Sequence, residues 1–161
     1  MKTILAIVVL VVTQFSQVSV FEGDWRTDLP SNFSENSIPA VISGMSFAVT
    51  ADTVNATSRF VIPGGGSFTS DECRLTIERC SFAATEVFQV DGKPHPSKYD
   101  PNGTIVAKWS NPYLLDVVYI KRGVHAETVH STYSVSADGR TVTHHVEYSA
   151  NGYVYERTFH R

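Results

Sequence analysis

The sequence predicts an all-β protein built from antiparallel strands, and two kinds of signal predict it. About ten short stretches rich in apolar residues are separated by turn signals about every eight to twelve positions, and none keeps the 3.6-residue period of a helix. Near the end of the chain, Asp138-Gly139 and Asn151-Gly152 supply the positive φ angles that two-residue hairpin turns require. An antiparallel sandwich or a closed barrel follows from this pattern.

The strands are expected to begin after an irregular N-terminal segment. At most one or two short helices are expected, near residues 34–43, where Pro39 keeps them brief. Pro63 followed by three glycines is a hard break, and Asp91-Gly92 with Pro94 and Pro96 is expected as a turn. Strands are expected at 45–50, 54–62, 73–78, 82–90, 104–109, 113–120, 127–136, 140–148 and 153–160.

The two C-terminal hairpins predict which side chains share a face. A two-residue loop at Asp138-Gly139 pairs Val135 with Val142 and Tyr133 with His144. The same loop at Asn151-Gly152 pairs Tyr148 with Tyr155, Val146 with Arg157 and His144 with Phe159. The more apolar face is expected to point inward, and it carries Tyr133, Val135, Val142, His144, Val146, Tyr148, Tyr155, Arg157 and Phe159.

This inward face is not purely apolar. His144, Arg157 and three tyrosines are expensive to bury unless they meet one another, water or a ligand. An aromatic wall with a few convergent polar groups is typical of a small-molecule cavity. The alternative is that Arg157 lies at the mouth of the barrel and extends along the tyrosines to solvent.

The N-terminus indicates a secretory leader. Lys2 precedes an uncharged apolar run at 4–12, which is too short for the ~20 residues of a membrane span. We expect a signal peptide at 1–19, cleaved after Ser19, with an uncleaved anchor as the alternative. Residues 20–161 are then one domain, secreted or periplasmic according to the source, and no later stretch is apolar enough to span a bilayer.

Two cysteines and three sequons are the covalent candidates. In an exported chain, Cys73 and Cys80 favour a disulfide, although the chain between them must reverse for the sulfurs to meet. Two separate thiols are the alternative. In a eukaryotic secretory pathway Asn32, Asn55 and Asn102 would be glycan acceptors on exposed loops.

Four short stretches resemble motifs of known proteins: Gly23-Asp24-Trp25 with Asp28, Asp91-Gly92-Lys93 with Pro96, Ser136-Ala137-Asp138-Gly139-Arg140-Thr141, and Val154-Tyr155-Glu156-Arg157. In these stretches the chain resembles the calycin barrels, which include the lipocalins and the fatty-acid-binding proteins. It is most similar to small secreted lipocalin-like proteins of uncharacterised function.

The resemblance implies one up-and-down barrel that closes N-terminus to C-terminus. It also implies that Trp25 caps one end beneath a strand-borne arginine, for which Arg157 is the expected partner. Fatty-acid carriers hold a ligand carboxylate with an Arg-x-Tyr pair on the last strand. The matching positions here are Tyr153 and Tyr155, so the arginine of that clamp is missing.

Composition and motifs exclude several classes of function. A formal net charge of −3 without basic clusters argues against nucleic acid as a partner. His144 and His145 are neighbours on a strand and point to opposite faces, so no metal site and no cofactor is expected. No nucleophile elbow, metalloprotease motif or phosphate loop occurs.

The sequence therefore predicts a secreted, non-enzymatic carrier of a small hydrophobic or amphipathic molecule. The expected lining comprises Tyr133, Val135, Val142, His144, Val146, Tyr148, Tyr155 and Phe159. One alternative is an interaction or inhibitor module that uses the loops at 63–70 and 94–101 around a filled barrel. A second is a haem-binding or isomerase-type enzyme that depends on His144. The ligand and the oligomeric state are left open.

Overall fold

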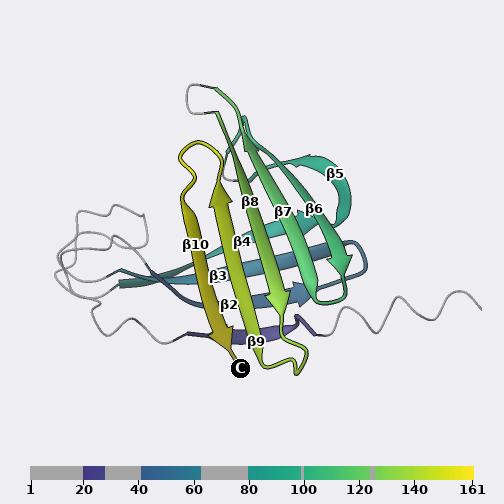
Figure 1. The fold of residues 1–161 in the computed structure, drawn as a ribbon, viewed down its shortest axis with the longest axis vertical. Coiled ribbons are helices and arrows are strands. Elements are labelled where there is room, and N and C mark those ends of the chain that lie inside the picture. Colours follow the sequence, from purple (N-terminus) through teal and green to yellow (C-terminus); the bar gives the residue numbers. More distant parts are fainter. Residues whose placement is uncertain (1–19, 28–40, 63–79, 99, 124–125) are drawn as a thin grey trace, which may run out of the picture.

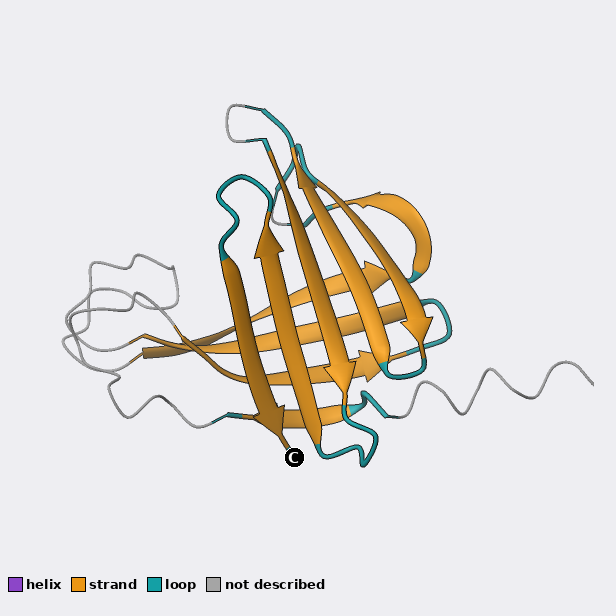
Figure 2. Cartoon of the chain, viewed as in Figure 1, coloured by secondary structure: helices purple, strands orange, loops and turns teal. Residues whose placement is uncertain are grey.

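The computed structural model describes residues 20–27, 41–62, 80–98, 100–123 and 126–161. These residues form ten strands in one antiparallel sheet, which curls into a nearly closed barrel without helices (Figures 1 and 2). The strands are β1 (Gly23–Arg26), β2 (Val41–Val49), β3 (Thr53–Ile62), β4 (Cys80–Gln89), β5 (Asp91–Pro96), β6 (Thr104–Asn111), β7 (Leu114–Lys121), β8 (Glu127–Val135), β9 (Thr141–Tyr148) and β10 (Val154–His160). The predicted all-β fold is confirmed.

The sheet order shows how the barrel closes. The order is β4-β3-β2-β1-β10-β9-β8-β7-β6-β5, so each strand pairs with its sequence neighbour except at two places. The first and last strands meet, with Arg26 paired to His160, which closes the barrel N-terminus to C-terminus as expected. β4 and β5 are the two edges of the sheet, although only Val90 separates them in the chain. In Figure 1, β1–β4 cross behind β6–β10 at a steep angle.

The face assignment of the C-terminal hairpins is confirmed. Val135 pairs with Val142 and Tyr133 with His144, as the Asp138-Gly139 turn predicts. The turn is closed by the Gly139 N–H, which donates to the Ser136 carbonyl at 2.8 Å, and Gly139 has a φ of 69°.

The register of the second hairpin is two residues away from the prediction. Tyr155 pairs with Val146, and Arg157 pairs with His144. The loop has four residues, 149–152, because the Tyr148 N–H donates to the Tyr153 carbonyl at 2.9 Å. Ser149 is instead tied to β8: it donates its N–H to the Thr128 carbonyl and accepts the Thr128 N–H on its hydroxyl. A shift of two keeps every side chain on its predicted face, since strand side chains alternate with a period of two.

We expect Gly139→Ala to lower the free energy of unfolding by about 1 kcal/mol, because a Cβ is disfavoured at a left-handed φ. An added Cβ at Gly139 would meet nothing within 4 Å, so the effect is one of backbone conformation alone. Urea denaturation measures it. Gly139→Asn is the matched control and should lose less, since asparagine tolerates this conformation. Equal stability of the alanine variant and the unaltered chain would contradict the turn geometry.

Several local predictions are corrected by the structure. Residues 91–96, expected as a turn, form the edge strand β5, and its two prolines are tolerated because an edge strand needs fewer N–H donors. The ladder with β6 shifts between Asp91 and Pro94, where the Asp91 carboxylate accepts the Lys93 N–H at 2.9 Å. Asn55 lies within β3 and is half-buried, so its sequon is not on an exposed loop. The part of the predicted helical region that is described, 41–43, belongs to β2.

Other predictions fall on residues that are not described. These are the signal peptide at 1–19, Asn32, the remainder of the predicted helix, the strand at 73–78 and Cys73. Cys80 is the first residue of β4. The predicted disulfide between Cys73 and Cys80 therefore stays a prediction.

The core of the barrel is built from both layers of the sheet. Fully buried side chains come from the N-terminal strands and from the C-terminal strands alike, and the largest are Phe21, Trp25, Met45, Val54, Phe88, Leu115, Val117, Val142 and Phe159. Phe47 meets Phe21 and Tyr133 edge-on, with ring centroids 5.7 and 5.5 Å apart. These contacts join the two layers into one hydrophobic cluster.

Candidate functional site

The predicted lining residues lie on one inner wall of the barrel. The strands β8, β9 and β10 carry them, because alternate residues of each strand point inward. Tyr133, His144, Val146 and Phe159 are buried, together with Val135 and Val142. Tyr148 and Tyr155 are half-buried near the end of the barrel that carries the β9–β10 loop, and Arg157 is half-buried opposite His144. The wall thus changes from apolar and closed to aromatic and partly exposed.

A chain of hydrogen-bonding groups runs across this wall. Nε2 of His144 and the Ser131 hydroxyl share a hydrogen bond of 2.8 Å, and both residues are buried. The Tyr133 hydroxyl is hydrogen-bonded to Ser131 and to the Tyr119 hydroxyl. The His144 imidazole stacks on the Tyr133 ring, with centroids 4.3 Å apart and planes 5° from parallel. Tyr155 meets the imidazole edge-on at 6.2 Å.

This series of hydrogen-bonded side chains ends at the His144 imidazole, which has one nitrogen without a hydrogen-bond partner among the described residues. Nδ1 of His144 is buried and has no hydrogen-bond partner among the described residues. A buried polar atom without a partner destabilises the fold by about 1–3 kcal/mol, so native proteins seldom keep one without a reason. Nδ1 of His144 is therefore a place where a bound molecule or a water would be stabilised.

Burial sets the protonation of these groups. It lowers the pKa of His144 to about 4, with His145 as the smaller second cause. It also raises the pKa of Tyr133 to about 12 and that of Tyr119 well above the usual value. At neutral pH these hydrogen-bonded side chains are a neutral imidazole and neutral hydroxyls, which can each donate and accept hydrogen bonds.

Sequence reasoning missed three residues of this interior: Ser131, Tyr119 and Glu86. Ser131 and Tyr119 are on the same face of their strands as the predicted lining, so strand alternation alone could have found them. Glu86 lies on β4, across the barrel, and pairs in register with the buried Ala56. Phe88 (1% exposed) is two residues away on the same face, whereas the intervening Val87 is 52% exposed. The alternation of 82, 84, 86 and 88 was therefore a usable signal for an inward carboxylate.

Trp25 closes the opposite end of the barrel. Its indole is fully buried, and its Nε1–H donates to the Phe21 carbonyl at 3.0 Å. The cation over the ring is Arg161, whose guanidinium carbon lies 4.1 Å from the ring centroid. Arg161 also donates to the carbonyls of Val20 and Glu22 at 2.6 and 2.9 Å. The predicted kind of cap is present, but the arginine over Trp25 is Arg161 rather than the expected Arg157, which lies on the inner face beside His144.

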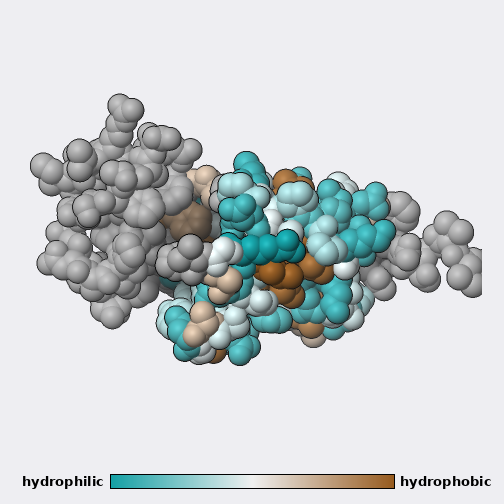
Figure 3. Space-filling model, turned by 90° about the horizontal axis from the view of Figure 1, so that it is seen from above, coloured by the Kyte–Doolittle hydropathy of each residue, from teal (hydrophilic) through white to brown (hydrophobic). Residues whose placement is uncertain are grey.

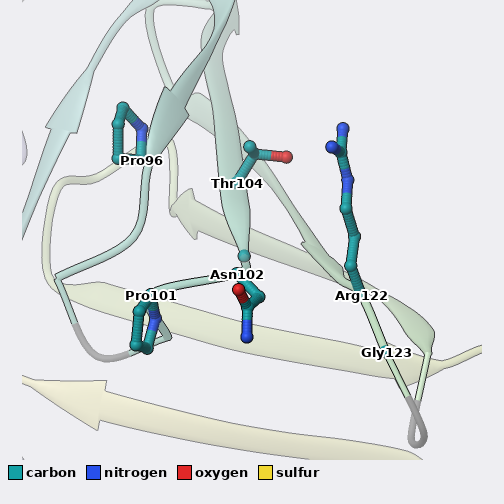
Figure 4. Close-up of a pocket in the computed structure, with 7 residues that line it drawn as sticks. Pro96, Pro101, Asn102, Thr104, Arg122 and Gly123 are labelled. Carbon is teal, nitrogen blue, oxygen red and sulfur yellow. The ribbon is translucent and has the colours of Figure 1, made fainter.

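Open pockets on the rim of the barrel include two that are lined by described residues. One, of about 660 Å³, follows the seam between β1, β2 and β10 and is lined by Asp24, Arg26, Thr27, Ser43, His160 and Arg161. The other, of about 590 Å³, lies where β5, β6 and β7 meet their loops (Figure 4) and is lined by Pro96, Pro101, Asn102, Gly103, Thr104, Arg122 and Gly123. Asn102 is exposed in a turn there, so this sequon is accessible as predicted.

The described part of the face that Figure 3 shows is mainly polar. Figure 3, which looks down from above, shows hydrophobic side chains gathered in the centre of that end with hydrophilic ones around them. In the described part of the chain, no group of three or more His, Cys, Asp or Glu side chains is placed to hold a metal ion. The same residues contain no helix with the length and apolarity that a membrane crossing demands.

The fold and the site together define a class of protein: a nearly closed antiparallel barrel with a partly polar interior, compatible with the calycin architecture. A comparison with protein-family models and with curated proteins gave no match for this chain.

Proposed function

We propose that this protein is a secreted, lipocalin-like, non-enzymatic carrier that binds a small amphipathic molecule inside its barrel. The hydrogen-bonded chain from Tyr119 to His144 carries the proposal, because it places polar groups on an inner wall that is otherwise aromatic and aliphatic. An apolar interior with a few polar groups suits a ligand that has one polar end. The apolar leader predicted at 1–19 supports export.

The arrangement of His144 bears on the enzymatic alternative. An axial haem ligand would use a free imidazole nitrogen, but Nε2 is hydrogen-bonded to Ser131 and Nδ1 is shielded from solvent. Haem binding through His144 would have to break the first contact or displace whatever covers the second. The carrier proposal needs neither step to explain the aromatic wall, so we favour it.

The experiment is a titration with N-phenyl-1-naphthylamine, an apolar dye whose fluorescence rises on leaving water. We expect saturable binding of one dye per chain. Tyr155→Ala should weaken it about fivefold, because an aromatic contact contributes about 1 kcal/mol. Tyr153→Ala is the matched control, since Tyr153 is 56% exposed and should not matter.

A second variant tests whether the dye is inside. Ala84 is half-buried and on the same face of β4 as Glu86, so Ala84→Phe should fill interior space and abolish binding. Circular dichroism confirms that the variant keeps its strands. Unchanged dye binding by both Ala84→Phe and Tyr155→Ala would place the dye outside the barrel and overturn the proposal.

A further inference from the structure

Glu86 is a carboxylate on the inner wall of the barrel. Its register partner Ala56 is 4% exposed and its face neighbour Phe88 is 1% exposed, so the strand geometry directs Glu86 into the same interior. The next pair along the two strands, Ser58 and Ala84, is also small. On its own wall Glu86 therefore has the small side chains of Ala56, Ser58 and Ala84 on one side and the ring of Phe88 on the other.

Aromatic rings stand next to this carboxylate. Phe88 meets Tyr119 and Tyr133 with ring centroids 6.3 Å apart in both cases. The negative charge of Glu86 acts on both tyrosine hydroxyls and contributes to the raised pKa of each. The carboxylate therefore lies within electrostatic range of the Tyr119 and Tyr133 hydroxyls, at the end of the hydrogen-bonded network away from His144.

The carboxylate is only partly compensated. Burial raises its pKa, while a hydrogen bond from the Lys98 N–H and the Lys98 ammonium act in the opposite direction without cancelling the effect. A cation placed beside Glu86 would stabilise its charged form, and aromatic faces attract the same cation through their quadrupoles. A protonated amine with an apolar body satisfies both, whereas a carboxylate ligand would be repelled.

We infer that the ligand is an organic amine whose ammonium group pairs with Glu86 and whose apolar body lies between the small side chains of β3–β4 and the rings of Tyr119 and Tyr133. This inference rests on the proposed carrier function and names its ligand class. Lys98 is the competing cation: its side chain is exposed and its charge lies within range of Glu86. A bound ammonium group takes over part of the compensation that Lys98 provides.

The test uses three probes with one body and different charges: 4-phenylbutylamine, 4-phenylbutan-1-ol and 4-phenylbutyrate. Isothermal titration calorimetry at pH 7 should give the tightest binding for the amine and the weakest for the carboxylate. Glu86→Gln, which keeps the size of the side chain, should weaken amine binding about tenfold and leave the alcohol unchanged. Glu147→Gln is the matched control, because Glu147 is exposed on the outer face of β9.

A second variant acts in the opposite direction. Lys98→Gln removes the competing cation and keeps the backbone N–H, so amine affinity should rise by about two- to fivefold. If Glu86→Gln and Lys98→Gln both leave the amine affinity unchanged, or if all three probes bind equally, the amine inference is overturned while the carrier proposal stands. If neither the alcohol nor the naphthylamine dye binds, the carrier proposal itself fails.

Discussion

Replacing Trp25 with alanine should lower the free energy of unfolding by about 3–5 kcal/mol. The indole is fully buried between the first and last parts of the chain, and its loss leaves a cavity at the closed end of the barrel. The variant also removes the bond from Nε1–H to the Phe21 carbonyl and leaves the Arg161 guanidinium without the ring beneath it. Urea denaturation followed by circular dichroism measures the change.

Two controls separate the contributions. Trp25→Phe keeps an aromatic ring but loses the indole N–H, so it should lose clearly less than the alanine variant. Arg161→Gln should lose about 1 kcal/mol, since this cation lies at an exposed position. A Trp25→Ala variant as stable as the parent would show that the seam between β1 and β10 is not held by this residue.

Acidification from pH 7 to pH 4 should cost about 3 kcal/mol of stability through His144 alone. Its pKa is about 4 in the folded protein against 6.5 for an unburied histidine, so the unfolded chain binds a proton that the folded one refuses. The contribution of His144 is therefore fully present above pH 6.5 and is lost progressively as pH falls towards 4. Urea denaturation at a series of pH values measures the slope.

The variant His144→Gln isolates this effect, because glutamine does not titrate. Its stability should depend less steeply on pH than that of the parent between pH 6.5 and 4, whatever its stability at pH 7. His130→Gln is the matched control: His130 is exposed on the outer face of β8 and does not contribute to the lowered pKa of His144. Glu86 works in the opposite direction, since burial raises its pKa, but it is common to all three proteins and cancels in the comparison. Parallel curves for the parent and His144→Gln would contradict the buried neutral imidazole.

The sequence predicted the faces of the strands better than their partners. Alternation placed Val142, His144 and Val146 inward, and burial of all three confirms it. The register of β9 against β10 was wrong because a local turn motif was used to set it, whereas Ser149 is held by Thr128 of a third strand. An Asn-Gly pair reports where the chain turns, and tertiary contacts decide how many residues the loop takes.

The contacts inside the barrel depend on how distant strands come together, which hairpin motifs alone do not predict. His144 and Ser131 are neighbours through adjacent strands, so the hairpin register contained their proximity. The charge of Glu86 acts on Tyr119 and Tyr133 because the sheet curls until β4 comes near β6. Likewise, the arginine over Trp25 is fixed by where the last strand ends against the first, and a motif match to Val154–Arg157 could not supply that distance.

Because β4 and β5 share no ladder of backbone hydrogen bonds, the sheet is curled into a barrel but is not closed along that line. A fully closed barrel has a fixed circumference, since the number of strands and their stagger set its width. Along the β4–β5 line the width of the wall is instead set by side-chain contacts, among them the hydrogen bond from the Lys98 N–H to the Glu86 carboxylate. Glu86 and Lys98 lie on the two sides of that line, so the proposed amine site borders the one part of the described wall that has no backbone ladder.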